Sequence, residues 1–177
     1  MSWPAASVRA AVRALAATGA CGLALACADP AVAGTRAPAP PFALAGSAGA
    51  VTLASYRGQF VYLDFWASWC GPCRHSFPWM NALQERLGGA GLKVVAINVD
   101  TDRADAQAFL AEHPATFTVA FDPAGTTPRA YGIKGMPSSV LLDRDGNIVF
   151  EHAGFLDAEA PELERRIAAA LLAKEAP

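Results

Sequence analysis

The sequence predicts an α/β domain with a central mixed sheet flanked by helices. From Phe42 onward, short runs rich in β-branched and aromatic residues alternate with longer amphipathic runs, the pattern of strands alternating with helices. Several short runs are apolar throughout, which suits strands covered on both faces. The chain has 177 residues, a length that predicts one such domain.

Strands are predicted at residues 51–56, 60–67, 93–100, 117–122, 138–143 and 147–152. The first of them, VTLASY, is expected at an edge of the sheet. The last two are joined by Asp-Arg-Asp-Gly, a sequence that favours a tight hairpin turn.

Helices are predicted at residues 72–87, 102–112 and 157–173. A pair of glycines ends the first helix, and Pro114 stops the second. Asp157 is the expected N-cap of the third. The buried face of this last helix is expected to carry Leu163, Ile167, Ala170 and Leu171.

Residues 1–28 read as an export signal. Two arginines precede an uncharged stretch rich in Ala and Leu, which is shorter than the roughly 20 residues of a membrane-spanning helix. The letters LALAC, ending at Cys27, resemble a bacterial lipoprotein box, in which the cysteine is lipidated. Cleavage after Ala28 or Ala33, giving a soluble exported protein, also fits. We favour lipidation at Cys27 and expect a periplasmic or other extracytoplasmic location.

Residues 29–41 are rich in Pro and Ala and carry almost no large apolar side chain. They predict an unfolded linker stiffened by its prolines, either a spacer reaching up to about 40 Å from a lipid anchor or a tail without a role. The folded domain is then expected over residues 42–177.

Of the four cysteines, Cys21 and Cys27 fall in the signal, so only Cys70 and Cys73 remain for the folded domain. A four-cysteine zinc site would need a second pair at matching spacing. A structural disulfide between residues three apart closes a very short loop and constrains the unfolded chain least. In an exported protein, the isolated pair therefore points to redox chemistry.

The predicted elements place Cys70 at the end of a buried strand and Cys73 in the first turn of the next helix. Cys70 is expected to face solvent beside the free N–H groups of that helix, which stabilise a thiolate and lower the pKa of the thiol. Cys70 is then the nucleophile, and Cys73 resolves the mixed disulfide. Gly71 and Pro72 allow the tight turn between them.

The run DFWASWCGPCR, residues 64–74, resembles the thioredoxin superfamily, and the export signal points to its TlpA/ResA-like branch. Further matches are Pro78, the GMPSS segment around Pro137, and Gly154 beside the substrate groove. The resemblance implies a thioredoxin fold with an N-terminal β extension over about residues 42–173. It also implies that residues 101–131 hold the helix and strand that TlpA-like members insert.

The same resemblance implies a substrate-binding surface around a cis bond before Pro137. On the residues alone, an ordinary trans proline opening a strand fits as well. With a cis bond, Met136 could pair with an extended substrate segment next to Cys70. Trp69 is assigned to this surface, and the remaining expected contacts are Gly71, Pro72 and Gly154.

One position departs from the TlpA/ResA-like pattern. Many members carry a glutamate three residues after the second cysteine, where this chain has Ser76. Asp64 instead matches the buried aspartate of thioredoxin. Thioredoxins place a lysine near this aspartate, and the corresponding position here is Ala96. Burial should raise the pKa of Asp64, so that its carboxylate can accept a proton from Cys73.

The Gly-Pro dipeptide between the cysteines is of the thioredoxin type and favours a reductant. The resemblance implies a DsbD- or CcdA-like membrane donor, with disulfide-bearing exported proteins as substrates. We expect a monomer without cofactor or metal, and the net charge of −2 gives no indication of nucleic-acid binding. The alternatives are an oxidant or isomerase of the same fold, and a copper-binding or chaperone module using Cys70, Cys73 and His75.

Overall fold

A seven-stranded mixed sheet with the strand order β2-β1-β5-β4-β3-β6-β7 forms the centre of the computed structural model, which describes residues 36–173. The strands are β1 (Ala43–Gly46), β2 (Gly49–Thr52), β3 (Phe60–Trp66), β4 (Leu92–Asn98), β5 (Thr118–Phe121), β6 (Ser138–Leu142) and β7 (Ile148–Ala153). The helices are α1 (Cys73–Leu87), α2 (Arg103–Glu112), α3 (Thr126–Ala130) and α4 (Ala160–Leu172). The predicted signal with Cys27, and the first part of the predicted linker, lie outside the described residues.

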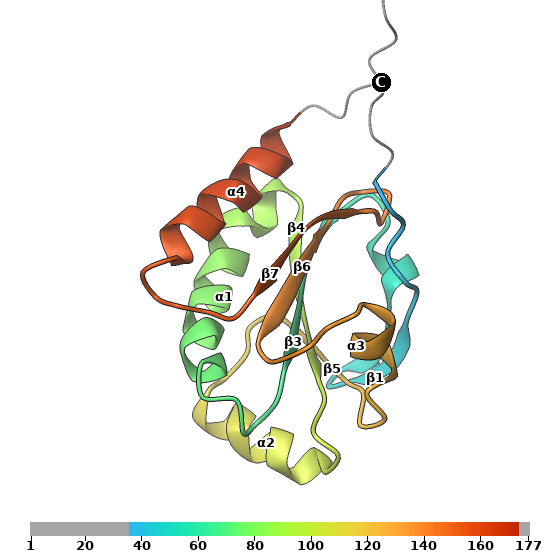
Figure 1. Ribbon diagram of the computed structural model, residues 1–177, viewed down its shortest axis with the longest axis vertical. Coiled ribbons are helices and arrows are strands. Elements are labelled where there is room, and N and C mark those ends of the chain that lie inside the picture. The colour runs from blue at the N-terminus through green and yellow to red at the C-terminus, as the bar shows by residue number, and fades with distance from the viewer. Residues whose placement is uncertain (1–35, 174–177) are drawn as a thin grey trace, which may run out of the picture. The chain divides into compact units, whose positions relative to one another are not determined.

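The central strand β3 is buried along its whole length, as its apolar sequence predicts. It pairs in parallel with β4 and antiparallel with β6. In Figure 1, α1 and α4 lie on one face of the sheet and α3 lies on the other. The carboxyl end of β3 therefore leads directly into the loop that carries the two cysteines.

An aromatic cluster fixes α1 and α2 against the sheet. The Trp66 ring lies 4.8 Å from the rings of both Phe77 in α1 and Phe109 in α2, measured between centroids. Phe77 also packs against Phe117, at 5.3 Å. Such tilted and edge-on contacts are the favourable arrangement of aromatic rings. The helix that begins at Cys73 is thus held, through Phe77, by side chains of β3 and α2 and by Phe117, which directly precedes β5.

The predicted strands and helices are present, and most of their ends lie within two residues of the predicted ends. The strand predicted at 51–56 is wrong in its second half: β2 ends at Thr52, and residues 53–56 form a 3₁₀ turn. The hydroxyl of Thr52 accepts a hydrogen bond from the Ser55 N–H at 3.3 Å and so caps this turn. β2 does form an edge of the sheet.

Two elements were not predicted, β1 and α3. β1 has the sequence ALAG, which carries little β propensity, and its pairing with β2 and β5 defines it. α3 has five residues, too few for a periodic pattern. The predicted cap of the last helix is also wrong, because α4 begins after Glu159. Asp157 instead lies 3.2 Å from Nδ1 of His75.

Part of the predicted linker packs against the domain instead of standing free. The Ala39 N–H donates to the Gly146 carbonyl at 2.9 Å, and the Ile148 N–H donates to the Ala37 carbonyl at 2.9 Å. Ala39 itself is buried. The backbone carbonyls and N–H groups of an extended segment are available for pairing. Here those of residues 37–39 pair with the β6–β7 hairpin, as a short added strand would.

Within residues 36–173, none of the helices combines the length and the hydropathy needed to cross a membrane.

We predict that Ala39→Pro lowers the free energy of unfolding by about 1 kcal/mol, because it removes the N–H donor to Gly146. The matched control is Ala37→Pro, which keeps the carbonyl that residue 37 contributes and should change stability less. Urea unfolding of both full-length variants measures the difference. Equal stabilities would contradict the docking of this segment.

Candidate active site

Cys70 and Cys73 form a disulfide at the start of α1, with their Cα atoms 5.4 Å apart. The Cys73 N–H points at the Cys70 sulfur, with a nitrogen–sulfur distance of 3.3 Å. Cys70 is the outer member of the pair, but with 3% exposure it does not face solvent as expected, and Cys73 is fully buried. The disulfide and this N–H hold the Cys70 sulfur against the first turn of the helix.

The start of α1 lies against the Cys70 sulfur. Pro72 precedes the helix, and no side chain caps its first turn. The N–H groups of residues 73–76 are not free as the sequence predicted, because they donate to the backbone carbonyls of residues 70–72. Only the Cys73 N–H also points at the Cys70 sulfur, so a thiolate at Cys70 would be stabilised by this N–H and by the partial positive charge of the helix N-terminus.

Asp64 is buried in the middle of β3, with 2% exposure. It lies on the same face of the strand as Tyr62 and Trp66, the face that packs against Cys73 and the rest of α1. Its neighbour on β4 is Ala96, so this neighbour brings no compensating charge. Desolvation raises the pKa of Asp64 well above its usual value, which confirms the expected direction.

Three polar residues outside the predicted site lie on this same face of the sheet. Ser139 on β6 pairs with Asp64 on one side and with His152 of β7 on the other. The Tyr62 hydroxyl donates to Ser139 Oγ at 2.7 Å, which leaves the hydrogen of Ser139 available for another acceptor. Asp64 Oδ2 and His152 Nε2 are both buried without a partner among the described residues.

Their sequence signal is the period of two: polar side chains at alternate positions of otherwise apolar strands share one face. That period could have grouped Tyr62 with Asp64. Only the register between strands could add Ser139 and His152 to them.

The peptide bond between Met136 and Pro137 is cis, as the resemblance implies. The Gly154 N–H donates to the Pro137 carbonyl at 2.8 Å and ties the end of β7 to this loop. Gly154 has φ +81°, which favours glycine at that position. Among residues 36–173, neither backbone group of Met136 has a hydrogen-bond partner, so both are available to a bound segment.

Trp69, which directly precedes the buried Cys70, is 70% exposed. Ser68 anchors this loop, because its N–H and its hydroxyl both donate to the Asp100 carboxylate, at 2.9 and 3.0 Å. Asp100 was not predicted as a site residue, since its partner is 32 positions away and no local pattern marks it.

Ser76 is buried in α1, and its hydroxyl donates to the Cys73 carbonyl at 3.2 Å. The position where many TlpA/ResA-like proteins have a glutamate therefore holds a neutral, satisfied side chain. Among residues 36–173, no group of three or more possible metal ligands gathers at one place.

The Redoxin family model matches residues 33–171. The chain belongs to the Redoxin family. Among curated proteins, it is similar to the thiol-disulfide oxidoreductase ResA of Bacillus thuringiensis subsp. konkukian, with 32% identity over 104 residues, or 59% of this chain. It is also similar to ResA of Bacillus subtilis, with 30% identity over 63% of this chain. The matches span 60% and 63% of the length of these two relatives.

Solved structures of related proteins have the same fold as this Redoxin-family chain. A crystal structure from Chlorobium tepidum, described as that of a candidate thiol:disulfide interchange protein DsbE, has 56% identity and a TM-score of 0.75. It covers 77% of this chain, and the match takes in 96% of that protein. StoA of Bacillus subtilis has 25% identity and a TM-score of 0.62, over 73% of this chain and 97% of its own. The thioredoxin fold is thus confirmed, while the assignment of residues 101–131 as a TlpA-type insert stays a prediction.

We predict that Asp64→Asn stabilises this Redoxin-family protein at neutral pH. Burial raises the folded-state pKa of Asp64 above its ordinary value of 3.8, so the acid form favours folding. That contribution is complete below pH 3.8 and is lost as the pH rises toward the folded pKa, by about 1.4 kcal/mol per pH unit. The stability gained by Asn should therefore grow with pH above 4.

Urea unfolding at pH 5 and pH 8 would measure this difference. The control is Asp145→Asn in the exposed hairpin turn, whose effect should be small at both pH values. An Asp64→Asn effect that does not change with pH would show that the carboxyl is not buried as described.

Proposed function

We propose that the protein is an exported thiol-disulfide oxidoreductase that reduces disulfides in other exported proteins. The observation that carries this proposal is the Cys70–Cys73 disulfide at the start of α1, with a backbone N–H aimed at the outer sulfur. The names of its ResA relatives support the same activity.

The reaction begins with both cysteines reduced. The Cys70 thiolate attacks one sulfur of the substrate disulfide, so that a Cys70–substrate disulfide forms and the other substrate sulfur leaves as a thiolate. Cys73 then loses its proton and attacks the Cys70 sulfur. The Cys70–Cys73 disulfide forms, the second substrate thiolate leaves, and two electrons have passed to the substrate.

Asp64 is the proposed acceptor of the Cys73 proton. It lies on the face of β3 toward α1, and its raised pKa brings it closer to that of a thiol, which favours proton transfer between them. Ser139, opposite Asp64 on β6, can donate its free hydrogen to the carboxylate and stabilise the ionised form. Position 76, where many TlpA/ResA-like proteins have a glutamate, holds a serine and so offers no alternative carboxylate.

The substrate segment is proposed to lie along Met136. Its backbone would take the two free groups of that residue, as a short added strand does. Trp69 would cover one side of the segment, and the exposed Gly71 and Pro72 would adjoin the substrate sulfur. Gly154 would complete the surface, next to the Pro137 carbonyl that it binds.

The predicted export signal supports a location outside the cytoplasm for this chemistry, with lipidation at Cys27 as the proposed anchor. A reductant in that oxidising environment must be recharged, so a DsbD- or CcdA-like membrane protein is the proposed electron donor.

The decisive experiment is the reduction potential of the Cys70–Cys73 pair, measured by equilibration of the protein with a dithiol buffer. We expect a value below about −230 mV, in the range of reducing members of the fold. A value above about −180 mV would instead make the protein an oxidant or isomerase. Stoichiometric Cu(I) binding without disulfide exchange would favour the copper-binding alternative.

We predict that Asp64→Asn slows the resolution of the mixed disulfide by about 100-fold near pH 7, because Cys73 loses its proton acceptor. In the unmodified protein the rate should rise as pH passes through the raised pKa of Asp64, since the ionised carboxylate is the active form. Stopped-flow Trp fluorescence with a disulfide peptide would follow the step. An unchanged rate and pH profile would exclude Asp64 from this role.

A further inference from the structure

A hollow of about 310 Å³ opens beside Trp69, between the cysteine loop and the segment that leads to Pro137. We call it the Trp69 hollow. Its apolar lining, besides Trp69, is Val99, Pro128, Ile133 and Met136. The charged residues of its lining are Arg129 and Lys134, and no acidic residue lines it.

The two cations keep their charge uncompensated. Both side chains are exposed, and neither forms an ion pair with any residue between 36 and 173. Arg129 Nη2 donates to the Ala124 carbonyl at 2.7 Å, a bond that orients the guanidinium without neutralising it. The hollow is therefore apolar at its wall and positive at its edge.

Asp100 and Asp122, which follow β4 and β5, accept hydrogen bonds from other residues of the protein. Asp100 is buried and accepts hydrogen bonds from Ser68. Burial opposes ionisation of Asp122, but hydrogen bonds from Thr127 and Thr126 lower its pKa. Glu151 shares the adjacent hollow with Lys134 without forming an ion pair with it.

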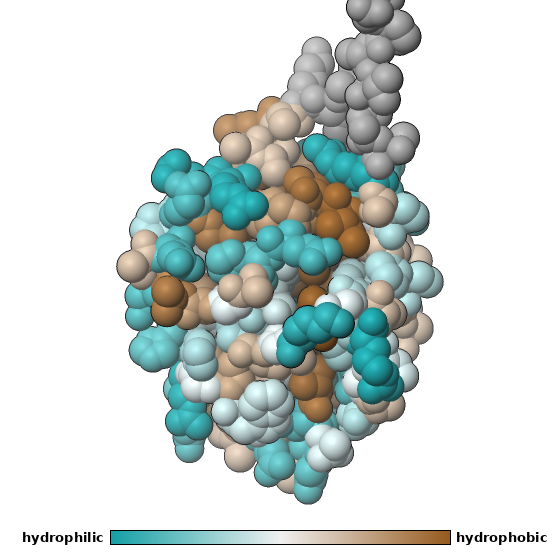
Figure 2. Space-filling view, viewed as in Figure 1, coloured by the Kyte–Doolittle hydropathy of each residue, from teal (hydrophilic) through white to brown (hydrophobic). Residues whose placement is uncertain are grey.

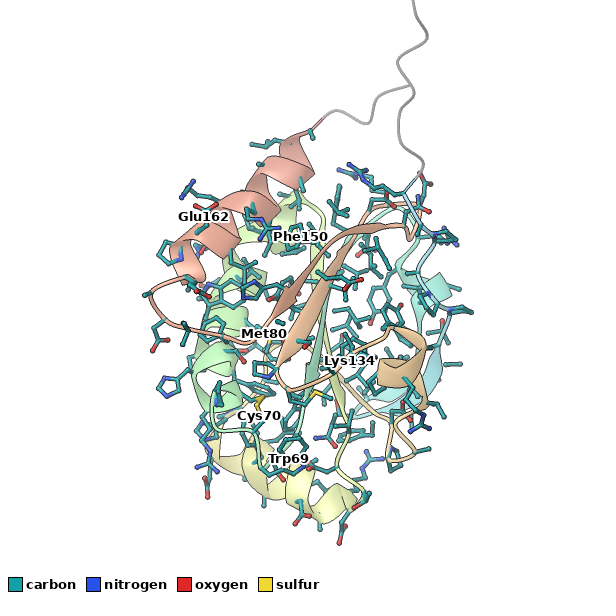
Figure 3. The ribbon with its side chains drawn as sticks, in the orientation of Figure 1. Trp69, Cys70, Met80, Lys134, Phe150 and Glu162 are labelled. Atoms are coloured by element: carbon teal, nitrogen blue, oxygen red, sulfur yellow. A yellow bond between two sulfur atoms is a disulfide. The ribbon has the colours of Figure 1, made fainter. Side chains whose placement is uncertain are left out.

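The position of the hollow places it within reach of a bound substrate. Met136 belongs to its lining and also carries the free backbone groups along which the substrate segment is proposed to lie. In an extended segment successive side chains point to opposite sides. When the substrate cysteine points at Cys70, the side chain of a residue next to it in the segment would face Trp69 and the two cations. Figure 3 shows Trp69, Cys70 and Lys134 at the same end of the sheet.

The positive charge here is local. The chain as a whole has a net charge of −2, so the pair of cations does not reflect a generally basic protein. In Figure 2, strongly hydrophilic side chains border hydrophobic surface in the lower half of the face in view. Such a border is suited to a side chain with an apolar stem and a charged head.

From these observations we infer that the Trp69 hollow selects substrates with an acidic residue, Asp or Glu, next to the reactive cysteine. The carboxylate contacts Lys134 and Arg129, while its stem packs on Trp69 and Met136. This inference rests on the proposed function and adds the chemical class of its substrates. Opposite charges at such a surface act mainly on specificity and on the rate of association.

Three disulfide-bonded peptides that differ only in the residues flanking the cysteine, Glu, Gln or Lys, would test this. The reduced protein should react about tenfold faster with the Glu peptide than with the Gln peptide at low salt, and slowest with the Lys peptide. The ratio should fall toward one at about 0.5 M salt, where exposed charges are screened. Stopped-flow fluorescence gives the second-order rate constants.

Charge variants locate the effect. Lys134→Gln and Arg129→Gln should each lower the Glu-to-Gln rate ratio, and the double variant Arg129→Glu with Lys134→Glu should favour the Lys peptide. The matched control is Lys93→Gln, which also removes one positive charge. Lys93 lies at the start of β4, the end of the strand away from the Trp69 hollow, so this variant should keep the ratio.

Equal rates for the three peptides, or a Glu preference that survives the double charge reversal, would overturn this inference while leaving the reductase intact. If the reduced protein reacts with none of the peptides, the proposed function itself fails and takes the inference with it.

Discussion

The burial of β3 between β4 and β6 is the constraint on which the rest of this molecule depends. Every residue of that strand is buried, and its hydrogen-bonding groups are used by neighbours on both sides. Its end is therefore fixed in the middle of the sheet. Because α1 begins seven residues later and is held by the Trp66–Phe77 contact, the intervening loop has little freedom. The disulfide is formed across that loop.

The same burial gives Asp64 its character. A carboxyl group in this layer meets aromatic and aliphatic side chains, so its ionised form is disfavoured. Ser139 is the cross-strand neighbour of Asp64, and because the Tyr62 hydroxyl donates to Ser139 Oγ, the hydrogen of Ser139 is left for another acceptor. The ionised form of Asp64 therefore destabilises the fold, while the proposed proton transfer requires that form, a conflict that is common where an ionisable group serves a reaction.

Around the buried sulfurs, the outer surface divides into parts with distinct properties. Met136 presents a free backbone, which is indifferent to side-chain type, while Trp69 presents an apolar plane. Arg129 and Lys134 add charge at one side only. Backbone pairing would allow many extended segments to bind, and the cations would then rank them, because charge complementarity discriminates among partners that the backbone accepts equally.

The sequence by itself determined the α/β class, most element ends, the redox pair and the burial of Asp64, because each rests on local order: periodicity, a short motif, or apolar neighbours in one strand. Tertiary structure decided what joins distant segments. The pairing of Ser139 and His152 with the Asp64 position, the Asp100–Ser68 anchor, β1, and the docking of residues 37–39 on the β6–β7 hairpin all require strand register or long-range contacts. No local pattern encodes register across a sheet, since it is fixed only when the strands pack together.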